Sequence, residues 1–126
     1  MHYVIDAHVL IERILEPSRL SRKVRSIFSA EENDFLIPTV CLLEIQYLTE
    51  IGRIKIDLDQ TLSILRETPH FELIPFDEAA MLQSLRLNTT RDPFDRIILA
   101  QALALSTKII TRDRWMKSTA PHLAIY

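Results

Sequence analysis

Two acids in this sequence stand where strands are expected to end. Asp6 follows the β-branched run 2–5, and Asp113 lies just past the apolar run 108–110. Short runs of this composition are typical of strands. Because function in parallel α/β sheets gathers outside the carboxyl ends of the strands, both carboxylates are candidates for one site. Taken alone, each is also an ordinary residue for a turn at the end of a strand.

Two further acids are expected near the beginnings of helices, at the same edge of the sheet. Asp92 followed by Pro93 is typical of an N-cap and a first helical residue, which places Asp95 in the first turn. Glu44 falls one turn into another helix, inside an apolar run where an unpaired carboxylate is costly to bury. A capping role for Asp95 and an arginine partner for Glu44 are the alternatives to a shared site.

Four carboxylates in one place would repel one another, and a divalent cation removes that conflict. A set of oxygen ligands, without cysteine or a histidine pair at metal spacing, favours Mg²⁺ or Mn²⁺ over zinc. Such ions keep part of their water shell and coordinate substrate phosphates. A bound water can be activated for attack while the metal offsets charge on the scissile phosphate. The four acids therefore indicate metal-dependent hydrolysis of a phosphate ester.

The elements that must position these acids alternate between short strands and helices. Strands are expected over residues 2–5, 35–37, 71–74 and 108–110, with a further edge strand at 123–126. Helices are expected over residues 9–15, 18–30, 39–52 and 57–68, and again from Asp77 and from Asp92. This alternation predicts one α/β domain over residues 1–126. Its mainly parallel sheet of four to five strands would be covered by helices on both faces.

Local residues set several of these boundaries. Thr39 is expected to cap the third helix, and Gly52, the only glycine, is expected at its C′ position. Asp77 is expected to cap the fifth helix. The side chains of that helix expected to face inward are Ala80, Met81 and Leu85.

The composition bounds the classes of function. Hydrophobic residues make up 48% of the chain and charged residues 25%, which is ordinary for a globular domain. The net charge of −2 means that nucleic-acid binding would have to use a local basic patch. The single cysteine, Cys41, excludes an internal disulfide and suits a reducing cytoplasm. We expect no signal peptide and no membrane span, and a single glycine excludes Gly-rich phosphate loops.

Four segments of the chain together resemble the PIN-domain family, in particular the VapC-type toxins of bacterial and archaeal toxin–antitoxin pairs. The segments are residues 4–10, residues 43–45, residues 91–102 and residues 110–113. Their order and spacing cover the chain from end to end. The Asp-Pro-Phe-Asp-Arg element at residues 92–96, followed by an apolar helix, is fairly specific, whereas an isolated acid after a strand is not.

The resemblance implies a PIN-like three-layer α/β/α fold and a Mg²⁺- or Mn²⁺-dependent endoribonuclease that hydrolyses RNA phosphodiester bonds. The acids that it assigns to catalysis and to metal binding are Asp6, Glu44, Asp95 and Asp113. Thr111 matches a hydroxyl residue that often supports the site, and Asp92 matches a frequent extra acid of the subgroup. A cognate antitoxin that inserts a segment near the active site, a homodimer and a cytoplasmic location are further implications.

The chain departs from the family pattern at two positions beside the first aspartate. A threonine or serine often follows that aspartate, and Ala7 removes this support hydroxyl. His8 matches a variant of the Asp-Pro-Phe-Asp-Arg subgroup and is expected as a helix-start residue rather than a metal ligand. Neither departure removes a candidate carboxylate, so we expect activity to survive.

Basic residues gather in sequence around the candidate acids. These are Arg91, Arg96, Arg112, Arg114 and Lys117. They could be solvated or paired with the acids, or they could contact phosphates and so position RNA without reading its sequence. Trp115 could stack on a base or pack in the core.

Three other functions are compatible with an α/β sheet bearing acids at strand ends. A receiver-like signalling domain would need paired acids after the first strand and a lysine after the last, and neither pattern is clear here. A haloacid-dehalogenase-like phosphatase would need a second aspartate where His8 stands. A non-catalytic PIN-like module that binds RNA or protein is the remaining alternative, because a complete acidic quartet does not prove turnover.

Overall fold

The computed structural model describes residues 1–126 and has one five-stranded sheet, in the order β3-β2-β1-β4-β5. The strands are β1 (His2–Ile5), β2 (Asp34–Pro38), β3 (Phe71–Ile74), β4 (Lys108–Ile110) and β5 (Ala124–Ile125). All four strand pairs are parallel; in the central strand, Val4 is in register with Leu36 of β2 and with Ile109 of β4. The predicted parallel sheet is confirmed, with β5 at its edge.

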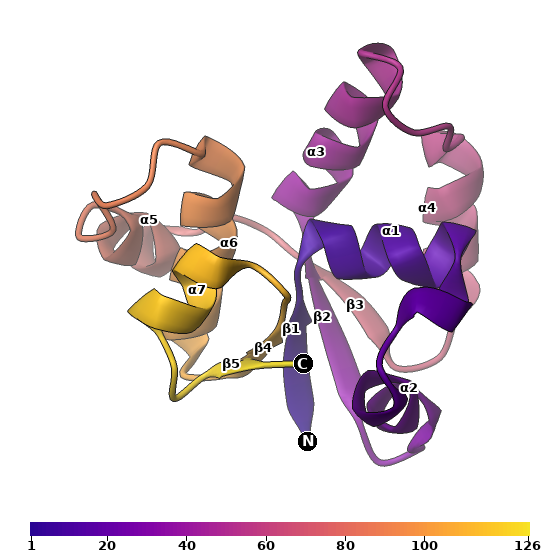
Figure 1. Cartoon of the computed structure of the whole chain (residues 1–126), viewed down its shortest axis with the longest axis horizontal. Coiled ribbons are helices and arrows are strands. Elements are labelled where there is room, and N and C mark those ends of the chain that lie inside the picture. Colours follow the sequence, from indigo (N-terminus) through magenta and orange to yellow (C-terminus); the bar gives the residue numbers. More distant parts are fainter.

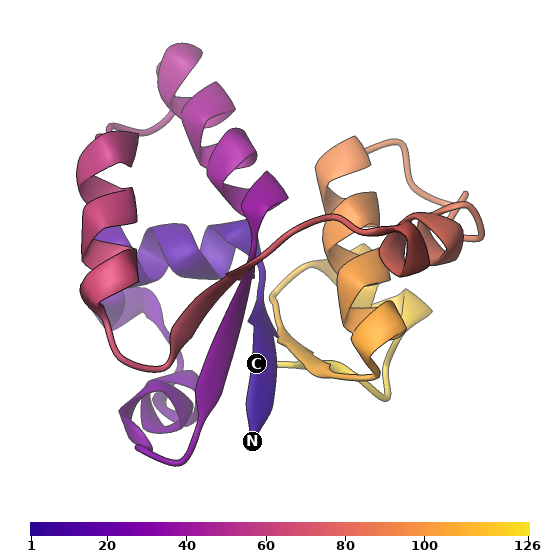
Figure 2. The same cartoon turned by 180° about the vertical axis from the view of Figure 1, so that it is seen from behind.

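Helices cover both faces of this sheet, as predicted. They are α1 (Ala7–Leu15), α2 (Arg22–Ser29), α3 (Thr39–Glu50), α4 (Leu58–Glu67), α5 (Glu78–Ser84), α6 (Pro93–Leu105) and α7 (Arg114–Thr119), with a 3₁₀ helix η1 (Pro17–Arg19). Helices α1 to α4 lie on one side of the sheet and α5 to α7 on the other (Figures 1 and 2). The strand order reverses between β1 and β4, which is where sites form in such sheets.

One continuous core of 26 buried residues joins the layers. The central strand contributes Val4 and Ile5, and α6 contributes Ile98 and Leu99, all without exposed surface. Burial of α6 is what its nearly all-round apolar sequence predicts. The two elements next to which Asp6 and Asp95 lie are therefore anchored in the buried core.

Three local predictions are wrong in detail. Residues 18–30 do not form one helix, because the Ser21 side chain accepts a hydrogen bond from the Val24 N–H (3.1 Å) and starts α2 there. Thr39 is the first residue of α3 and caps nothing; Pro38 takes the N-cap position without a side-chain bond. In α5 only Ala80 is buried, while Met81 and Leu85 are exposed. The short helix contacts α6 through one narrow face.

Other boundaries follow the sequence. Asp57 and Asp77 cap α4 and α5 through their side chains, as expected for aspartate at these positions. Gly52 has φ +78°, the left-handed conformation that ends α3 and that glycine adopts without a steric penalty. The helices are all too short or too polar to span a lipid bilayer.

Candidate active site

The four candidate acids approach the carboxyl edge of the sheet from four elements. Asp6 is the N-cap residue of α1, directly after β1, and Asp113 is the N-cap residue of α7, beyond β4. Glu44 lies in α3, and Asp95 lies in the first turn of α6. Figure 1 shows the starts of α1 and α3 close together at the top of the sheet, with α6 on the other side of β1.

Thr111 joins the first and last of these acids. Its hydroxyl donates a hydrogen bond to Asp6 Oδ2 (2.7 Å), and its oxygen accepts one from the Asp113 N–H (3.0 Å). Thr111 is fully buried and Asp6 is 1% exposed, so this bond fixes the Asp6 carboxylate in a single orientation. The other oxygen, Asp6 Oδ1, is buried without any hydrogen-bond partner.

Glu44 is also buried, and its partner is a histidine. His8 Nε2 lies 3.4 Å from Glu44 Oε2, while the histidine ring itself remains mostly exposed. The second carboxylate oxygen, Glu44 Oε1, is buried without a partner. The alternative of an arginine partner for Glu44 is therefore wrong, and His8 has a structural contact that sequence reasoning missed.

Asp92 and Asp95 have different surroundings although they are three residues apart. The Asp92 carboxylate caps α6 by accepting hydrogen bonds from the N–H groups of Phe94 (2.9 Å) and Asp95 (3.2 Å). The Asp95 carboxylate forms no hydrogen bond or ion pair within the chain, so a reciprocal capping box is not formed. Asp92 is thus the capping residue and Asp95 is free for another role.

Mutual repulsion among the acids is visible in their pKa values. Burial, which is the largest cause, and the charges of Asp6, Asp92, Asp113 and Glu44 together raise the pKa of Asp95 to about 8. The pKa of Glu44 is raised to about 7, mainly by burial, with His8 opposing the shift. Burial also raises the pKa of Asp6, against the hydrogen bond from Thr111. The charges of these acids therefore interact unfavourably with one another in the metal-free fold.

Two carboxylate oxygens at this edge of the sheet could accept a cation. The unpaired buried oxygens of Asp6 and Glu44 are acceptors that a metal or its bound water would satisfy. No group of three or more His, Cys, Asp or Glu side chains is drawn together tightly enough to cage a metal directly. The structure therefore does not bring the four candidate carboxylates together as one set of metal ligands. The unpaired oxygens of Asp6 and Glu44 are hard acceptors of the kind that Mg²⁺ prefers.

Comparison with known proteins agrees with this fold. Residues 3–120 match the family model described as PIN domain. The chain belongs to the PIN domain family. Among curated proteins, none matches the sequence significantly.

Several solved structures share the fold of this chain. VapBC2 from Rickettsia felis, bound to a promoter DNA fragment, has a TM-score of 0.74 at 20% identity and covers 100% of this chain and 98% of its own. FitAcB from Neisseria gonorrhoeae has a TM-score of 0.70 at 20% identity, with coverages of 100% and 97%. A toxin–antitoxin complex from Klebsiella pneumoniae has a TM-score of 0.68 at 18% identity, with coverages of 98% and 96%.

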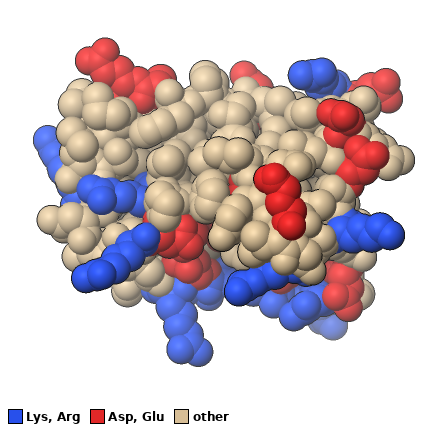
Figure 3. Space-filling model, turned by 90° about the horizontal axis from the view of Figure 1, so that it is seen from above, with Lys and Arg blue, Asp and Glu red and all other residues tan.

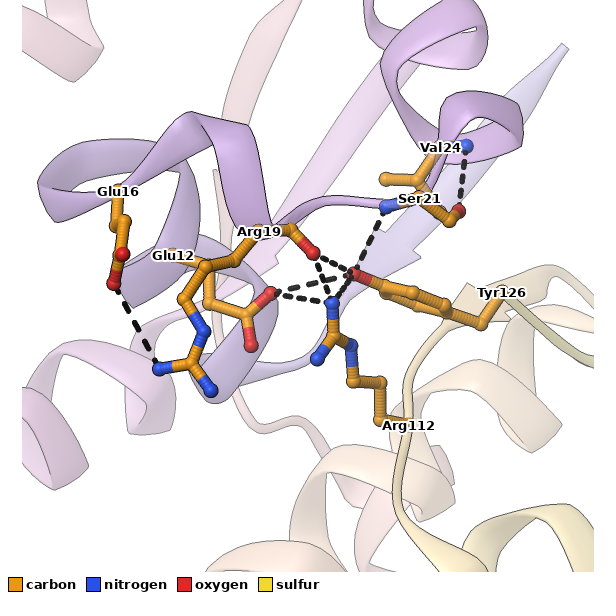
Figure 4. Close-up of polar contacts among 7 residues, drawn as sticks. All are labelled: Glu12, Glu16, Arg19, Ser21, Val24, Arg112 and Tyr126. Carbon is orange, nitrogen blue, oxygen red and sulfur yellow. Dashed lines mark hydrogen bonds and ion pairs between the residues drawn. The ribbon is translucent and has the colours of Figure 1, made fainter.

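The basic residues around this PIN site divide into two groups. Arg96 Nε donates to the Ser84 carbonyl (2.7 Å), and Arg112 pairs with Glu12 (3.3 Å). Arg112 also donates to the Tyr126 hydroxyl and the Arg19 carbonyl (Figure 4). Both arginines therefore fasten elements of the protein together, a role that the sequence did not indicate. The basic side chains that stay exposed and unpaired are Arg91, Arg114 and Lys117.

The indole of Trp115 packs against the core, and its N–H donates to the Thr89 hydroxyl (2.8 Å). Of the two interpretations of this residue, packing is the one that these contacts favour.

Seen from above, the molecule presents basic side chains along one edge, beside an acidic group (Figure 3).

Replacing Thr111 with valine is expected to destabilise the fold and to impair the site. Valine has the same shape but leaves Asp6 Oδ2 buried without its donor, which costs roughly 1–3 kcal/mol. Urea unfolding measures this loss, and Thr111→Ser is the matched control because it keeps the hydroxyl. A valine variant as stable as the wild type would show that the Thr111–Asp6 hydrogen bond contributes nothing.

Proposed function

We propose that this PIN domain is a VapC-like toxin, a Mg²⁺- or Mn²⁺-dependent endoribonuclease that hydrolyses RNA phosphodiester bonds. The observation that carries the proposal is the pair of buried, unpaired carboxylate oxygens of Asp6 and Glu44 beside a half-buried Asp95. Membership of the PIN family supports it, as do the toxin–antitoxin complexes among the proteins of the same fold.

The residues of the site have distinct parts in this proposal. Asp6, Glu44, Asp95 and Asp113 would hold the metal directly or through its waters. Thr111 keeps the Asp6 carboxylate oriented, and Asp92 starts the helix that carries Asp95. When bound, the metal would supply a water of lowered pKa and offset charge on the scissile phosphate.

The exposed basic residues would position the RNA. Arg91 and Arg114 immediately flank two of the acidic elements, and Lys117 lies one turn further along α7. Charged contacts of this kind hold the phosphates on either side of the cleaved bond without selecting a sequence. Arg96 and Arg112 would act indirectly, by holding the loops that carry the acids.

A cognate antitoxin is the protein partner that we propose, by analogy with the complexes of VapBC2 and of the Klebsiella protein. We further propose that the single domain acts in the cytoplasm as a homodimer. Co-expression with the product of a small neighbouring reading frame, followed by co-purification, tests the antitoxin.

Incubation of purified protein with RNA is the direct test of the function. Cleavage is expected with Mg²⁺ or Mn²⁺ and none in EDTA. A thermal shift on adding Mg²⁺ to RNA-free protein reports metal binding independently of turnover. Binding of RNA without cleavage in either metal would favour the alternative, a non-catalytic PIN-like RNA- or protein-binding module.

A further inference from the structure

A second cationic feature lies away from the acids, in a recess between α1, η1 and α2. Its volume is about 370 Å³, and its lining residues are Arg13, Pro17, Leu20, Arg25, Phe28 and Ser29. No acidic side chain lines it. The chain as a whole has a net charge of −2, whereas this recess is lined by two arginines and no carboxylate. Its local charge is therefore opposite to that of the whole chain.

Arg13 is held in an orientation that leaves its donors free. Its guanidinium carbon lies 5.2 Å from the ring centroid of Phe28 and 4.6 Å from that of Phe71. The two rings are nearly parallel, with 6.3 Å between their centroids. The guanidinium forms no hydrogen bond or ion pair within the chain. Aromatic packing thus fixes the plane of the group while its N–H donors remain available to an anion.

The surrounding segment is strongly basic. Residues 13–25 contain five cationic side chains and one acid, Glu16. Only Arg19 is paired with a carboxylate, that of Glu16 at 3.7 Å, and both groups are well exposed. Arg22, Lys23 and Arg25 are exposed and form no ion pair. Several neighbouring cations favour a polyanion such as a nucleic acid over a single carboxylate. Each phosphate of the nucleic acid that is neutralised releases counterions, which adds to the affinity.

The elements that line the recess are also linked to the elements that carry the candidate acids. Helix α1 begins at the site, after Asp6, and Arg13 lies about 9 Å further along its axis. Arg112, between Thr111 and Asp113, donates to the Arg19 carbonyl and so fastens η1 to the loop that carries Asp113 (Figure 4). An RNA strand bound at the acids would therefore have to extend beyond the few nucleotides that cover them to contact the recess as well.

We propose that Arg13 and Arg25 form a phosphate-binding subsite for the RNA, remote from the bond that is cleaved. The proposal rests on the proposed nuclease function, since it assigns the recess to the same substrate. Arg13 supplies a fixed, fork-shaped donor set to one phosphate, and Arg25 adds charge at the rim. The contact is to the backbone, so it strengthens binding without reading bases.

The test is binding of a labelled oligouridylate of roughly 16 nucleotides in EDTA, where no cleavage occurs. Arg13→Gln is expected to weaken binding roughly 5- to 10-fold at low salt and to reduce the slope of log affinity against log salt by about 0.7, the value for one phosphate contact. Arg13→Lys should restore the slope but only part of the affinity, because lysine lacks the fork. Arg86→Gln, an exposed arginine after α5, is the matched control and should change neither quantity.

Arg25→Gln is the second variant, because Arg25 is exposed and its loss leaves the aromatic packing intact. It should weaken RNA binding in the same direction as Arg13→Gln. Unchanged RNA binding in this variant overturns the subsite. Loss of binding to a Glu-rich peptide, with RNA binding intact, also overturns it and assigns the recess to an acidic protein partner.

Cleavage separates this proposal from the nuclease function. If the function and the subsite both hold, the variants raise KM for long RNA but leave cleavage of a fragment of about four nucleotides unchanged, since the fragment covers only the acids. If the wild type binds RNA through these arginines but cleaves nothing in Mg²⁺ or Mn²⁺, the subsite stands and the nuclease proposal fails.

Discussion

Asp95→Asn is expected to abolish metal-dependent RNA cleavage while raising the melting temperature of the metal-free protein at pH 8. The pKa of this carboxyl is raised to about 8 by burial and by four neighbouring acids, so its charge is unfavourable in the metal-free fold. An amide of the same shape removes the repulsion and also removes the proposed metal ligand. We expect the cleavage rate to fall by about 100-fold or more, as when a preorganised electrostatic group is lost from a site.

Asp92→Ala is the comparison that separates catalysis from helix capping. Asp92 satisfies the N–H groups of Phe94 and Asp95, and loss of such a cap typically costs about 1 kcal/mol. This variant should be less stable than the wild type and should keep most of its cleavage activity. Cleavage rates and melting temperatures of both variants, with and without Mg²⁺, decide the matter. A dead but fully stable Asp92→Ala, beside an active Asp95→Asn, would mean that the metal ligand is Asp92.

The capping role of Asp92 could be predicted from the sequence because it is local. An Asp-Pro pair at a helix start fixes which residue caps, and the next turn follows from helical geometry. The strands could be predicted from the sequence equally well, since each is a short apolar run between turn residues. The error at α5 arose because Met81 and Leu85 have helical spacing, whereas their burial depends on whether another element covers them.

The contacts that sequence reasoning missed are those between distant segments. His8 and Glu44 are 36 residues apart and come together only because β1 and β2 are neighbours in the sheet. Arg112 reaches a carbonyl 93 residues away. Its position beside Asp113 suggested an RNA contact, but a basic residue next to an acid in sequence can point to either side of a loop. The packing of η1 beneath that loop decides its direction.

In the metal-free protein, the free energy of unfolding is expected to fall as the pH rises from about 5 to about 9. Glu44 and Asp95 have pKa values raised to about 7 and about 8 in the fold, against ordinary values of 4.5 and 3.8. The folded state therefore binds more protons than the unfolded state between these limits, and stability decreases with pH wherever that holds. Above the raised pKa values both groups are charged and the loss levels off.

Asp34 provides an internal contrast, because its hydrogen bond from His70 lowers its pKa below 3.8. Its contribution to stability is present above that value and is lost only as the pH falls through the lowered pKa. It therefore adds no slope between pH 5 and 9.

Urea unfolding in EDTA across this range measures the slope, and the variants Glu44→Gln and Asp95→Asn should each flatten it. Mg²⁺ should act most strongly at high pH, where it no longer competes with protons for the carboxylates. At about 100 times its dissociation constant it should add about 2.7 kcal/mol. The double variant should lose most of the response to pH and to metal in this window, leaving the part that comes from Asp6. A wild-type stability that is flat or rises from pH 5 to 9, with no effect of Mg²⁺, would show that these acids do not repel one another in the fold and do not form a cation site.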